Sequence, residues 1–472
     1  MVATYSAEVQ TSGRQYLLST ARAALAAPNQ SLLPLTAQVN HQDHLEIGGC
    51  DVVKLVQQYG SPLYILDETT LRTACQQYRE AFERYYPGDS QVLYASKAWN
   101  CLAVCAIADQ EGLGIDVVSG GELYTALQAG VSPEKLYLHG NNKSREELTL
   151  AVTCGCRIVV DNWLDLQTLV AIAAERPSAP PIPILIRLTP GIECHTHEYI
   201  RTGHLDSKFG FDPNQLDEVF TLISQQSCLS CLGLHAHIGS QIFELQPHAD
   251  LASVMVQWLV KANSYGLPVT EVNIGGGLGI CYTEADDPPS IDAWVKVICD
   301  AMVTACQIQQ LPLPKLLSEP GRSVIGPACV TAYTQGSRKT IPGLRTYLSV
   351  DGGMSDNPRP ITYQSLYRVV VANRMSAPLT QTVAIAGKHC ESGDILIKEA
   401  KVPETETGDI LVVMATGAYN YSMASNYNRL PRPAAVLVQA GDSHLILQRE
   451  TYADLIRQDS LPERLSQSRT EG

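Results

Sequence analysis

The chain has 472 residues, a length typical of two or three domains, and 45% of them are hydrophobic whereas 17% are charged. It can therefore bury large cores and is not a disordered tail. Asp and Glu outnumber Lys and Arg by 48 to 34, and the net charge of −14 argues against a general nucleic-acid binder or docking on an anionic membrane.

The N-terminal residues 1–32 read as an extension without the long apolar core of a signal peptide. No segment approaches the roughly eighteen apolar residues that span a bilayer. The 14 cysteines are too sparse for a disulfide scaffold, and the pair Cys228 and Cys231 has no second pair at zinc spacing. We expect a cytoplasmic protein with reduced thiols and no metal, while an organelle-targeting role of the extension stays open.

From about residue 61, short apolar segments alternate with stretches of helical spacing, such as 68–85 and 213–224. Eight such units over about 250 residues predict parallel strands joined by helices, and their number favours a (β/α)8 TIM barrel over a doubly wound sheet. The expected strands are Leu63–Leu66, Gln91–Ala95, Ile115–Val118, Lys135–Leu138, Arg157–Val160, Ile182–Leu188, Leu232–Ile238 and Glu271–Ile274.

After about residue 320, alternating segments are separated by Gly, Pro, Asn and Asp, which predicts a mostly antiparallel β domain. Its expected strands include Arg345–Val350, Thr382–Ala386, Ile410–Val413 and Ala435–Gln439. The expected organisation is an N-terminal extension (1–32), a segment that joins the β domain (33–60), the barrel (61–318) and the C-terminal β domain (319–472).

Chemically capable residues stand where the predicted strands end, which is where barrel enzymes place their active sites. Lys97 follows one strand, and a lysine there either reaches solvent or has a covalent role. Three glycines, 275–277, follow another strand and would let backbone N–H groups converge on a phosphate, with Ser240 as a further donor. His237 could stack on an aromatic cofactor or be an ordinary core histidine.

Glu319 and Arg322 flank a Pro-Gly turn at the end of the barrel. An acid that faces a pyridine nitrogen keeps that nitrogen protonated, although a local ion pair on a surface turn would look the same. Taken together, a reactive lysine, a phosphate cradle, a stacking histidine and such an acid indicate pyridoxal 5'-phosphate bound as a Schiff base.

These residues lie in motifs through which the chain resembles diaminopimelate decarboxylases, of the alanine racemase-like, fold-type III group of pyridoxal-phosphate enzymes. The resemblance covers nearly all of residues 33–445. The motifs, in family order, are YASKA (94–98), GIDVVSGGEL (114–123), HAHIGSQ (235–241), NIGGGLGI (273–280), EPGR (319–322), DGGMSDNPRPITY (351–363), CESGD (390–394) and GAYNYSMASNYNRLPRP (417–433).

The resemblance implies decarboxylation of meso-2,6-diaminopimelate to L-lysine, the last step of lysine biosynthesis. Lys97 would carry the Schiff base and Cys390 would donate the proton, with CESGD reaching the active site of the partner subunit in a homodimer. The implied cofactor-binding residues are Lys97, Asp116, His237, Ser240, Gly276, Gly277, Glu319, Gly321, Arg322 and Tyr419. The implied substrate-binding residues are Arg322, Arg359, Tyr363, Glu391 and Tyr419.

Three alternatives stay open at this point. A related decarboxylase of ornithine, arginine or carboxynorspermidine would bind a distal cation, whereas Arg359 and Tyr363 favour a distal carboxylate. A racemase would need a second acid/base on the opposite face, where this chain has the CESGD thiol segment. A non-catalytic carrier of pyridoxal phosphate would not need a β domain with Cys390 and Tyr419.

The chain departs from the family pattern in two places. One is the pair Trp99 and Asn100 after the lysine motif, and the other is the N-terminal extension.

Overall fold

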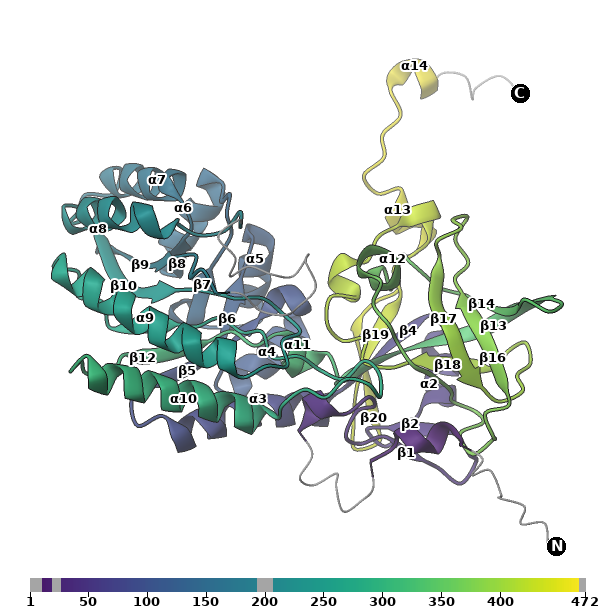
Figure 1. Cartoon of the computed structure of the whole chain (residues 1–472). Helices are drawn as coiled ribbons and strands as arrows, with labels where there is room; N and C mark the ends of the chain where they lie inside the picture. The colour runs from purple at the N-terminus through teal and green to yellow at the C-terminus, as the bar shows by residue number, and fades with distance from the viewer. Residues whose placement is uncertain (1–10, 19–26, 193–206, 467–472) are drawn as a thin grey trace, which may run out of the picture.

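The structure is a computed structural model and describes residues 11–18, 27–192 and 207–466, so parts of the expected N-terminal extension (1–10 and 19–26) lie outside the described residues. A barrel and a β domain lie side by side (Figure 1). The described helices are α2 (Val52–Tyr59), α3 (Glu68–Tyr85), α4 (Leu102–Gln110), α5 (Gly120–Gln128), α6 (Arg145–Cys154), α7 (Trp163–Ala174), α8 (Leu216–Ser224), α9 (Gln246–Ser264), α10 (Ile291–Ile308), α11 (Arg322–Ile325), α12 (Arg359–Tyr363), α13 (Tyr452–Leu455) and α14 (Glu463–Ser466).

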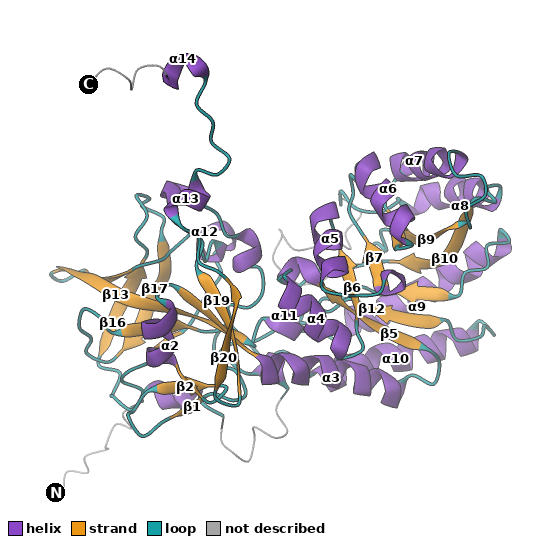
Figure 2. Ribbon diagram, turned by 180° about the vertical axis from the view of Figure 1, so that it is seen from behind, coloured by secondary structure: helices purple, strands orange, loops and turns teal. Residues whose placement is uncertain are grey.

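Eight parallel strands close the barrel, in chain order around it, and the last of them pairs with the first. They are β5 (Ser90–Ala95), β6 (Gly114–Val117), β7 (Leu136–Leu138), β8 (Arg157–Val160), β9 (Ile182–Arg187), β10 (Leu229–His235), β11 (Glu271–Asn273) and β12 (Lys315–Ser318). Helices surround them on the outside (Figure 2). The barrel and the mostly antiparallel β domain confirm the predicted alanine racemase-like fold.

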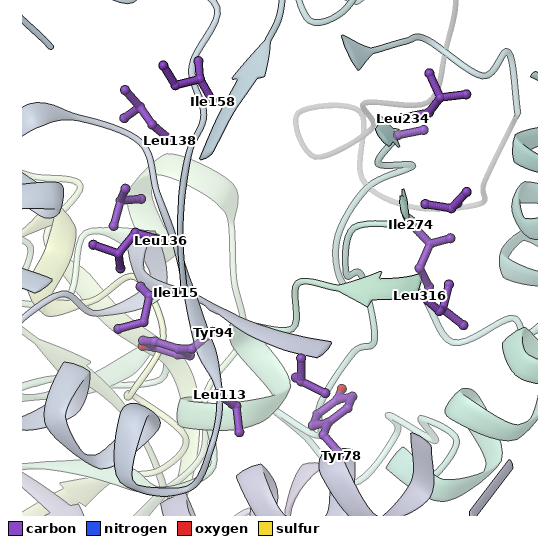
Figure 3. Close-up of a cluster of buried hydrophobic side chains, with 14 of the residues drawn as sticks. Tyr78, Tyr94, Leu113, Ile115, Leu136, Leu138, Ile158, Leu234, Ile274 and Leu316 are labelled. Atoms are coloured by element: carbon purple, nitrogen blue, oxygen red, sulfur yellow. The ribbon is translucent and has the colours of Figure 1, made fainter. Parts of the chain in front are cut away.

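Side chains from alternate strand positions are buried on opposite faces of the barrel wall. Leu93, Tyr137, Val159, Leu185 and Leu317 form one small buried cluster. Their neighbours along the strands belong to the large core against the helices, among them the residues labelled Tyr94, Leu136, Ile158 and Leu316 in Figure 3. Because both faces are buried, the strands read as nearly continuous apolar runs in the sequence.

Local signals fix where the barrel helices begin and end. The hydroxyl of Ser144 accepts from the backbone N–H of Glu147, and the Glu147 carboxylate accepts from that of Ser144, so α6 starts with a capping box. The helix ends at Gly155, whose positive φ of 87° is a left-handed conformation that suits glycine. Shortly after β6 and β8, the side chains of Ser119 and Asn162 cap α5 and α7 by accepting from the backbone N–H groups of Glu122 and Asp165.

The segment Leu63–Asp67 (β4) differs from expectation, because it lies in the β domain and not in the barrel. It pairs antiparallel with β13 (Cys329–Ile341) and parallel with β19 (Ala434–Gln439). All five of its residues are buried, so its sequence is as apolar as that of a barrel strand. The barrel strands therefore begin with β5, and the eighth is β12, which was not among the expected strands.

The β domain is a nine-stranded sheet in which most neighbouring strands are antiparallel. Its other strands are β14 (Arg345–Val350), β15 (Val369–Val371), β16 (Gln381–Ala386), β17 (Ile395–Val402), β18 (Ile410–Val413) and β20 (Asp442–Leu447). Residues 33–60 add α2 and a small sheet of β1 (Gln38–Val39), β2 (Leu45–Ile47) and β3 (Cys50–Asp51). Leu45 and Val52 share a core with Val330 and Val436 of the large sheet. Within the described ranges, no helix is long and apolar enough to cross a membrane.

Candidate active site

The C-terminal ends of the barrel strands bring polar side chains together at one end of the barrel. Each of the eight strands contributes one residue, either at its last positions or within two residues after it. In chain order these residues are Lys97, Asp116, His139, Asp161, Arg187, His235, Asn273 and Glu319. This arrangement places ionisable groups around a common space, as barrel enzymes require.

Lys97 lies in a short 3-10 turn after β5 and projects into a cavity, so 42% of its side chain is solvent-accessible. Its Nζ is 3.9 Å from Oδ2 of Asp116, whose two carboxylate oxygens are buried and have no hydrogen-bond partner among the described residues. Desolvation lowers the pKa of Lys97, but the carboxylates of Asp116 and Glu319 outweigh it and raise the pKa. The free amine is therefore held as an ammonium group that attracts an anionic ligand.

Glu319 is anchored by three side chains, although it is buried. Its Oε1 accepts from Nδ2 of Asn273 at 2.6 Å and lies 2.9 Å from Nε2 of His139, and its Oε2 lies 3.0 Å from Nε2 of His235. Burial alone would raise the pKa of Glu319, but the two histidines hold it well below its usual value. Burial lowers the pKa of His235 to about 4, so this histidine is a neutral imidazole that donates Nε2–H to a carboxylate.

The glycine loop after β11 packs too closely for side chains. A Cβ on Gly276 would lie 2.3 Å from the backbone oxygen of Glu319, and one on Gly277, where φ is +128°, would lie 2.8 Å from the backbone oxygen of Gly239. The backbone N–H of Gly276 donates to Nδ1 of His237 at 3.3 Å, which fixes the imidazole against the loop. Burial lowers the pKa of His237 well below its usual value, so its ring is neutral.

A pair of buried arginines forms the opposite part of the site. Arg322 donates from Nε to Oγ of Ser240 at 3.1 Å, and its guanidinium carbon lies 4.9 Å from the ring centre of Tyr419. Arg359, in α12, donates to the hydroxyl of Tyr367 at 2.8 Å. Tyr419 has a positive φ of 68°, and its backbone N–H donates to the carbonyl of Ala98 at 2.7 Å, which holds it beside the lysine turn.

Two cavities contain most of the expected residues, and they share Lys97 and Phe209. The larger, of about 540 Å³, is lined by Lys97, Ser240, Arg322, Arg359, Tyr363 and Tyr419 among others. The other, of about 310 Å³, is lined by Lys97, His139, Arg187, His235, His237 and Glu319 among others. Lys97 therefore stands between an acidic and histidine-rich compartment and an arginine-rich one.

Cys390 and Glu391 lie elsewhere in the structure. Both are exposed, on the turn between β16 and β17, and neither lines the two cavities of its own chain. The turn is nevertheless ordered, because Asp394 accepts from the backbone N–H of Met354 and from both the backbone N–H and Nδ1 of His389. The backbone N–H of Cys390 also donates to Oδ1 of Asn428 at 2.8 Å.

Sequence reasoning missed several residues of this site. His139, His235 and Asn273 all end or follow barrel strands, so the rule that found Lys97 could also have found them. Tyr282, whose hydroxyl contacts both Arg322 and Arg359, lies in a loop without any comparable signal.

Comparisons with known proteins agree with this geometry. The family of pyridoxal-dependent decarboxylases, pyridoxal binding domain, matches residues 68–326. Diaminopimelate decarboxylase from Synechocystis sp. is 66% identical over 450 residues, which cover 94% of this chain and 96% of the relative. The Bacillus subtilis diaminopimelate decarboxylase is 46% identical over 430 residues, which cover 90% and 97%.

Solved structures give the same result. Diaminopimelate decarboxylase from M. jannaschii in complex with L-lysine has a TM-score of 0.85 and 30% identity, covering 93% of this chain and 100% of that one. The Helicobacter pylori enzyme with L-lysine has a TM-score of 0.79 and 28% identity, covering 86% and 98%. By its fold, its site and these relatives, the chain belongs to the diaminopimelate decarboxylase family of pyridoxal-dependent enzymes.

Proposed function

We propose that the protein decarboxylates meso-2,6-diaminopimelate to L-lysine with pyridoxal 5'-phosphate, which is the last step of lysine biosynthesis. The observation that carries the proposal is the position of Lys97 between the anchored carboxylate of Glu319 and the paired arginines Arg322 and Arg359. One compartment suits a pyridine ring, and the other suits a substrate that ends in a second carboxylate.

The residues present fit this cofactor. Carboxylate oxygens offer about four lone-pair positions, and the three contacts of Glu319 leave room for a pyridinium N–H. A glycine loop that excludes side chains allows close approach of a phosphate to backbone N–H groups. We assign the phosphate to Ser240, Gly276, Gly277, Tyr419 and the backbone at Gly321 and Arg322, and the ring to His237, Asp116 and Glu319; the side chain of Arg322 is left for the substrate.

The bound cofactor acts as an electron sink for the carbanion that remains after carbon dioxide leaves. In our proposal Lys97 would hold the cofactor covalently through its Nζ. Arg359 and Tyr363 bind the distal end of the substrate, because a planar guanidinium recognises a carboxylate by two parallel hydrogen bonds. Glu319, kept ionised by its buried contacts, holds the proton of the ring nitrogen.

Cys390 donates the proton that completes the reaction, and we propose that it comes from the partner subunit of a homodimer, together with Glu391. The exposure of both residues outside the cavities of their own chain supports this. The ordered turn around Asp394 supports it too, since a thiol that acts across an interface must be presented in a fixed position.

Product identification tests the reaction directly. The purified holoenzyme is incubated separately with meso-diaminopimelate, ornithine and arginine, and the products are identified by mass spectrometry. Lysine from diaminopimelate alone supports the proposal. A diamine from ornithine or arginine would instead assign the enzyme to a related decarboxylase, and the absence of any product despite bound cofactor would favour a carrier.

Subunit mixing tests the shared site. Lys97→Ala and Cys390→Ala are each expected to be inactive, while a mixed dimer contains one site with both native residues. Random exchange should then restore about a quarter of the native activity, because half of the dimers are mixed and each has one intact site. Mixing without recovery, although mass spectrometry detects mixed dimers, would place Cys390 in the site of its own chain, and an active Cys390→Ala homodimer would place it outside the reaction.

A further inference from the structure

The loop that follows the glycine turn forms a wall of the larger cavity and carries a tyrosine between the two arginines. The hydroxyl of Tyr282 accepts from Nη1 of Arg322 at 2.6 Å and from Nη1 of Arg359 at 2.7 Å. Tyr282 is buried, and its ring meets that of Tyr367 edge-on, with centres 5.4 Å apart. Two guanidinium groups on different elements thus share one oxygen atom.

A shared acceptor overcomes the mutual repulsion of two buried cations. Guanidinium groups that converge on one point repel each other, and this repulsion is strong where water is excluded. The hydroxyl oxygen offsets it with two hydrogen bonds to charged donors, and the guanidinium carbon of Arg359 also lies 4.9 Å from the centre of the Tyr282 ring. Burial raises the pKa of Tyr282, but both arginines outweigh it and lower the pKa, as expected for an oxygen that faces two cations.

The N-terminal segment 28–31 holds this loop from outside the barrel. Asn29 is fully buried, and its Nδ2 donates to the carbonyls of Gly279 at 3.2 Å and Pro289 at 2.8 Å. Its own carbonyl accepts from the backbone N–H of Cys281 at 2.9 Å. One asparagine therefore ties together the two ends of the loop and the residue directly before Tyr282.

We propose that Tyr282, kept in place by Asn29, is a positioning residue that sets Arg322 and Arg359 as a clamp for the distal carboxylate of the substrate. This inference rests on the proposed function, since it requires a substrate with a second carboxylate. It also gives the N-terminal segment a role in specificity. Each arginine keeps further N–H groups for a ligand, because the contacts with Tyr282 involve only Nη1.

Two ligands of equal chain length separate the clamp from the rest of the site. Decarboxylation removes one carboxylate of diaminopimelate, so the product L-lysine keeps the other, whereas cadaverine has the same two amines and no carboxylate. A loss of clamp geometry should weaken the binding of L-lysine and leave the binding of cadaverine unchanged. A general loss of packing or of cofactor would weaken the binding of both ligands.

The experiment measures the inhibition constants of L-lysine and cadaverine against the holoenzyme and its Tyr282→Phe variant. Loss of hydrogen bonds to charged groups predicts that L-lysine binds about tenfold more weakly, while the constant for cadaverine changes by less than about twofold. The KM for diaminopimelate should rise by a similar factor with kcat nearly constant. The matched control is Tyr85→Phe, which removes a hydroxyl that donates to Asp292 on the outer helices.

The second variant, Asn29→Ala, tests the support from the N-terminal segment. The ratio of the two inhibition constants does not depend on the fraction of active protein, so it stays informative even if this variant is less stable. A shift in the same direction as in Tyr282→Phe is expected. Equal weakening of both ligands, or an unchanged ratio in Tyr282→Phe, would overturn the inference. A native enzyme that makes no lysine would instead overturn the proposed function.

Discussion

The turn that carries Cys390 depends on one buried carboxylate, and we expect its removal to be costly. Asp394 is 3% exposed and accepts three hydrogen bonds, from the backbone N–H of Met354 at 2.7 Å and from the backbone N–H and Nδ1 of His389 at 3.0 and 2.7 Å. A Cβ on Gly353 or Gly387 would lie 2.4 or 2.0 Å from the oxygens of this carboxylate, so the packing leaves no room for water to replace it.

The magnitude follows from the number of donors. Asp394→Asn keeps one amide oxygen for His389 but turns its NH2 group toward the N–H of Met354, so one charge-assisted bond is lost and two donors face each other. Bonds to charged groups contribute about 1.5–3 kcal/mol, which predicts a loss of about 2–3 kcal/mol of unfolding free energy for Asn. Asp394→Ala leaves all three donors without the acceptor and should lose about 4 kcal/mol or more.

Urea denaturation measures these losses, and alkylation of Cys390, followed by mass spectrometry, measures the order of the turn. Both variants should alkylate Cys390 faster and turn over more slowly while they keep the cofactor. Asp300→Asn is the control, because its carboxylate pairs with Lys296 on an exposed helix face and should change stability by less than about 0.5 kcal/mol. If the Asn variant matched the native protein in stability and turnover, the carboxylate would not be what holds the turn.

Three further substitutions test other parts of the structure. In Gly276→Ala the new Cβ meets a backbone oxygen at 2.3 Å, so cofactor affinity measured by equilibrium dialysis should fall at least about tenfold, whereas Gly121→Ala, with no atom closer than 3.8 Å, should keep it. In the native protein the buried carboxylate of Asp165 lies 2.7 Å from Nζ of Lys143. Lys143→Met leaves this charge without its cation and should lower the free energy of unfolding by about 3–5 kcal/mol, measured by urea denaturation. The double variant that also carries Asp165→Leu should not show this loss. Burial lowers the pKa of His248 to about 3 from 6.5, so below pH 6.5 the unfolded chain takes up a proton that the folded protein does not, and stability falls as the pH falls. His248 contributes about 2 kcal/mol to the loss between pH 7 and pH 5, beside the contributions of the other buried histidines. Denaturation curves at both pH values should therefore show a loss about 2 kcal/mol smaller in His248→Leu than in the native protein.

The barrel was predictable because each βα unit carries its own local signals. The one wrongly assigned strand, β4, shows what such signals do not specify. The segment Leu63–Asp67 is apolar at most positions because it is central in a sheet, and a central strand of either domain has that texture. Its partners, Cys329–Ile341 and Ala434–Gln439, are far away in the sequence. Pairing over such distances depends on tertiary packing, which no local pattern records.

Much of the site was predictable from the ends of the strands together with the family motifs. Lys97, Ser240, Arg322 and Arg359 do line one cavity, as a shared site requires. That Cys390 is exposed and lines neither cavity of its own chain agrees with the family resemblance alone, because motif order does not by itself specify which copy of the chain supplies a residue.

The placement of β4 also has a consequence for the order in which the protein can form. The barrel is an insertion in the β domain, because β4 precedes it and both neighbours of β4 follow it. During synthesis β4 emerges early and then waits, with its hydrogen-bonding edges open, until residues 329 and 434 have left the ribosome. Residues 68–326 can close their barrel in the meantime, since neighbouring strands there are consecutive in the chain except at the final closure. The time during which β4 stays unpaired and can misassemble is therefore the time that the ribosome needs to translate the barrel. An N-terminal fragment that ends before residue 329 should keep β4 unpaired and accessible to chaperones.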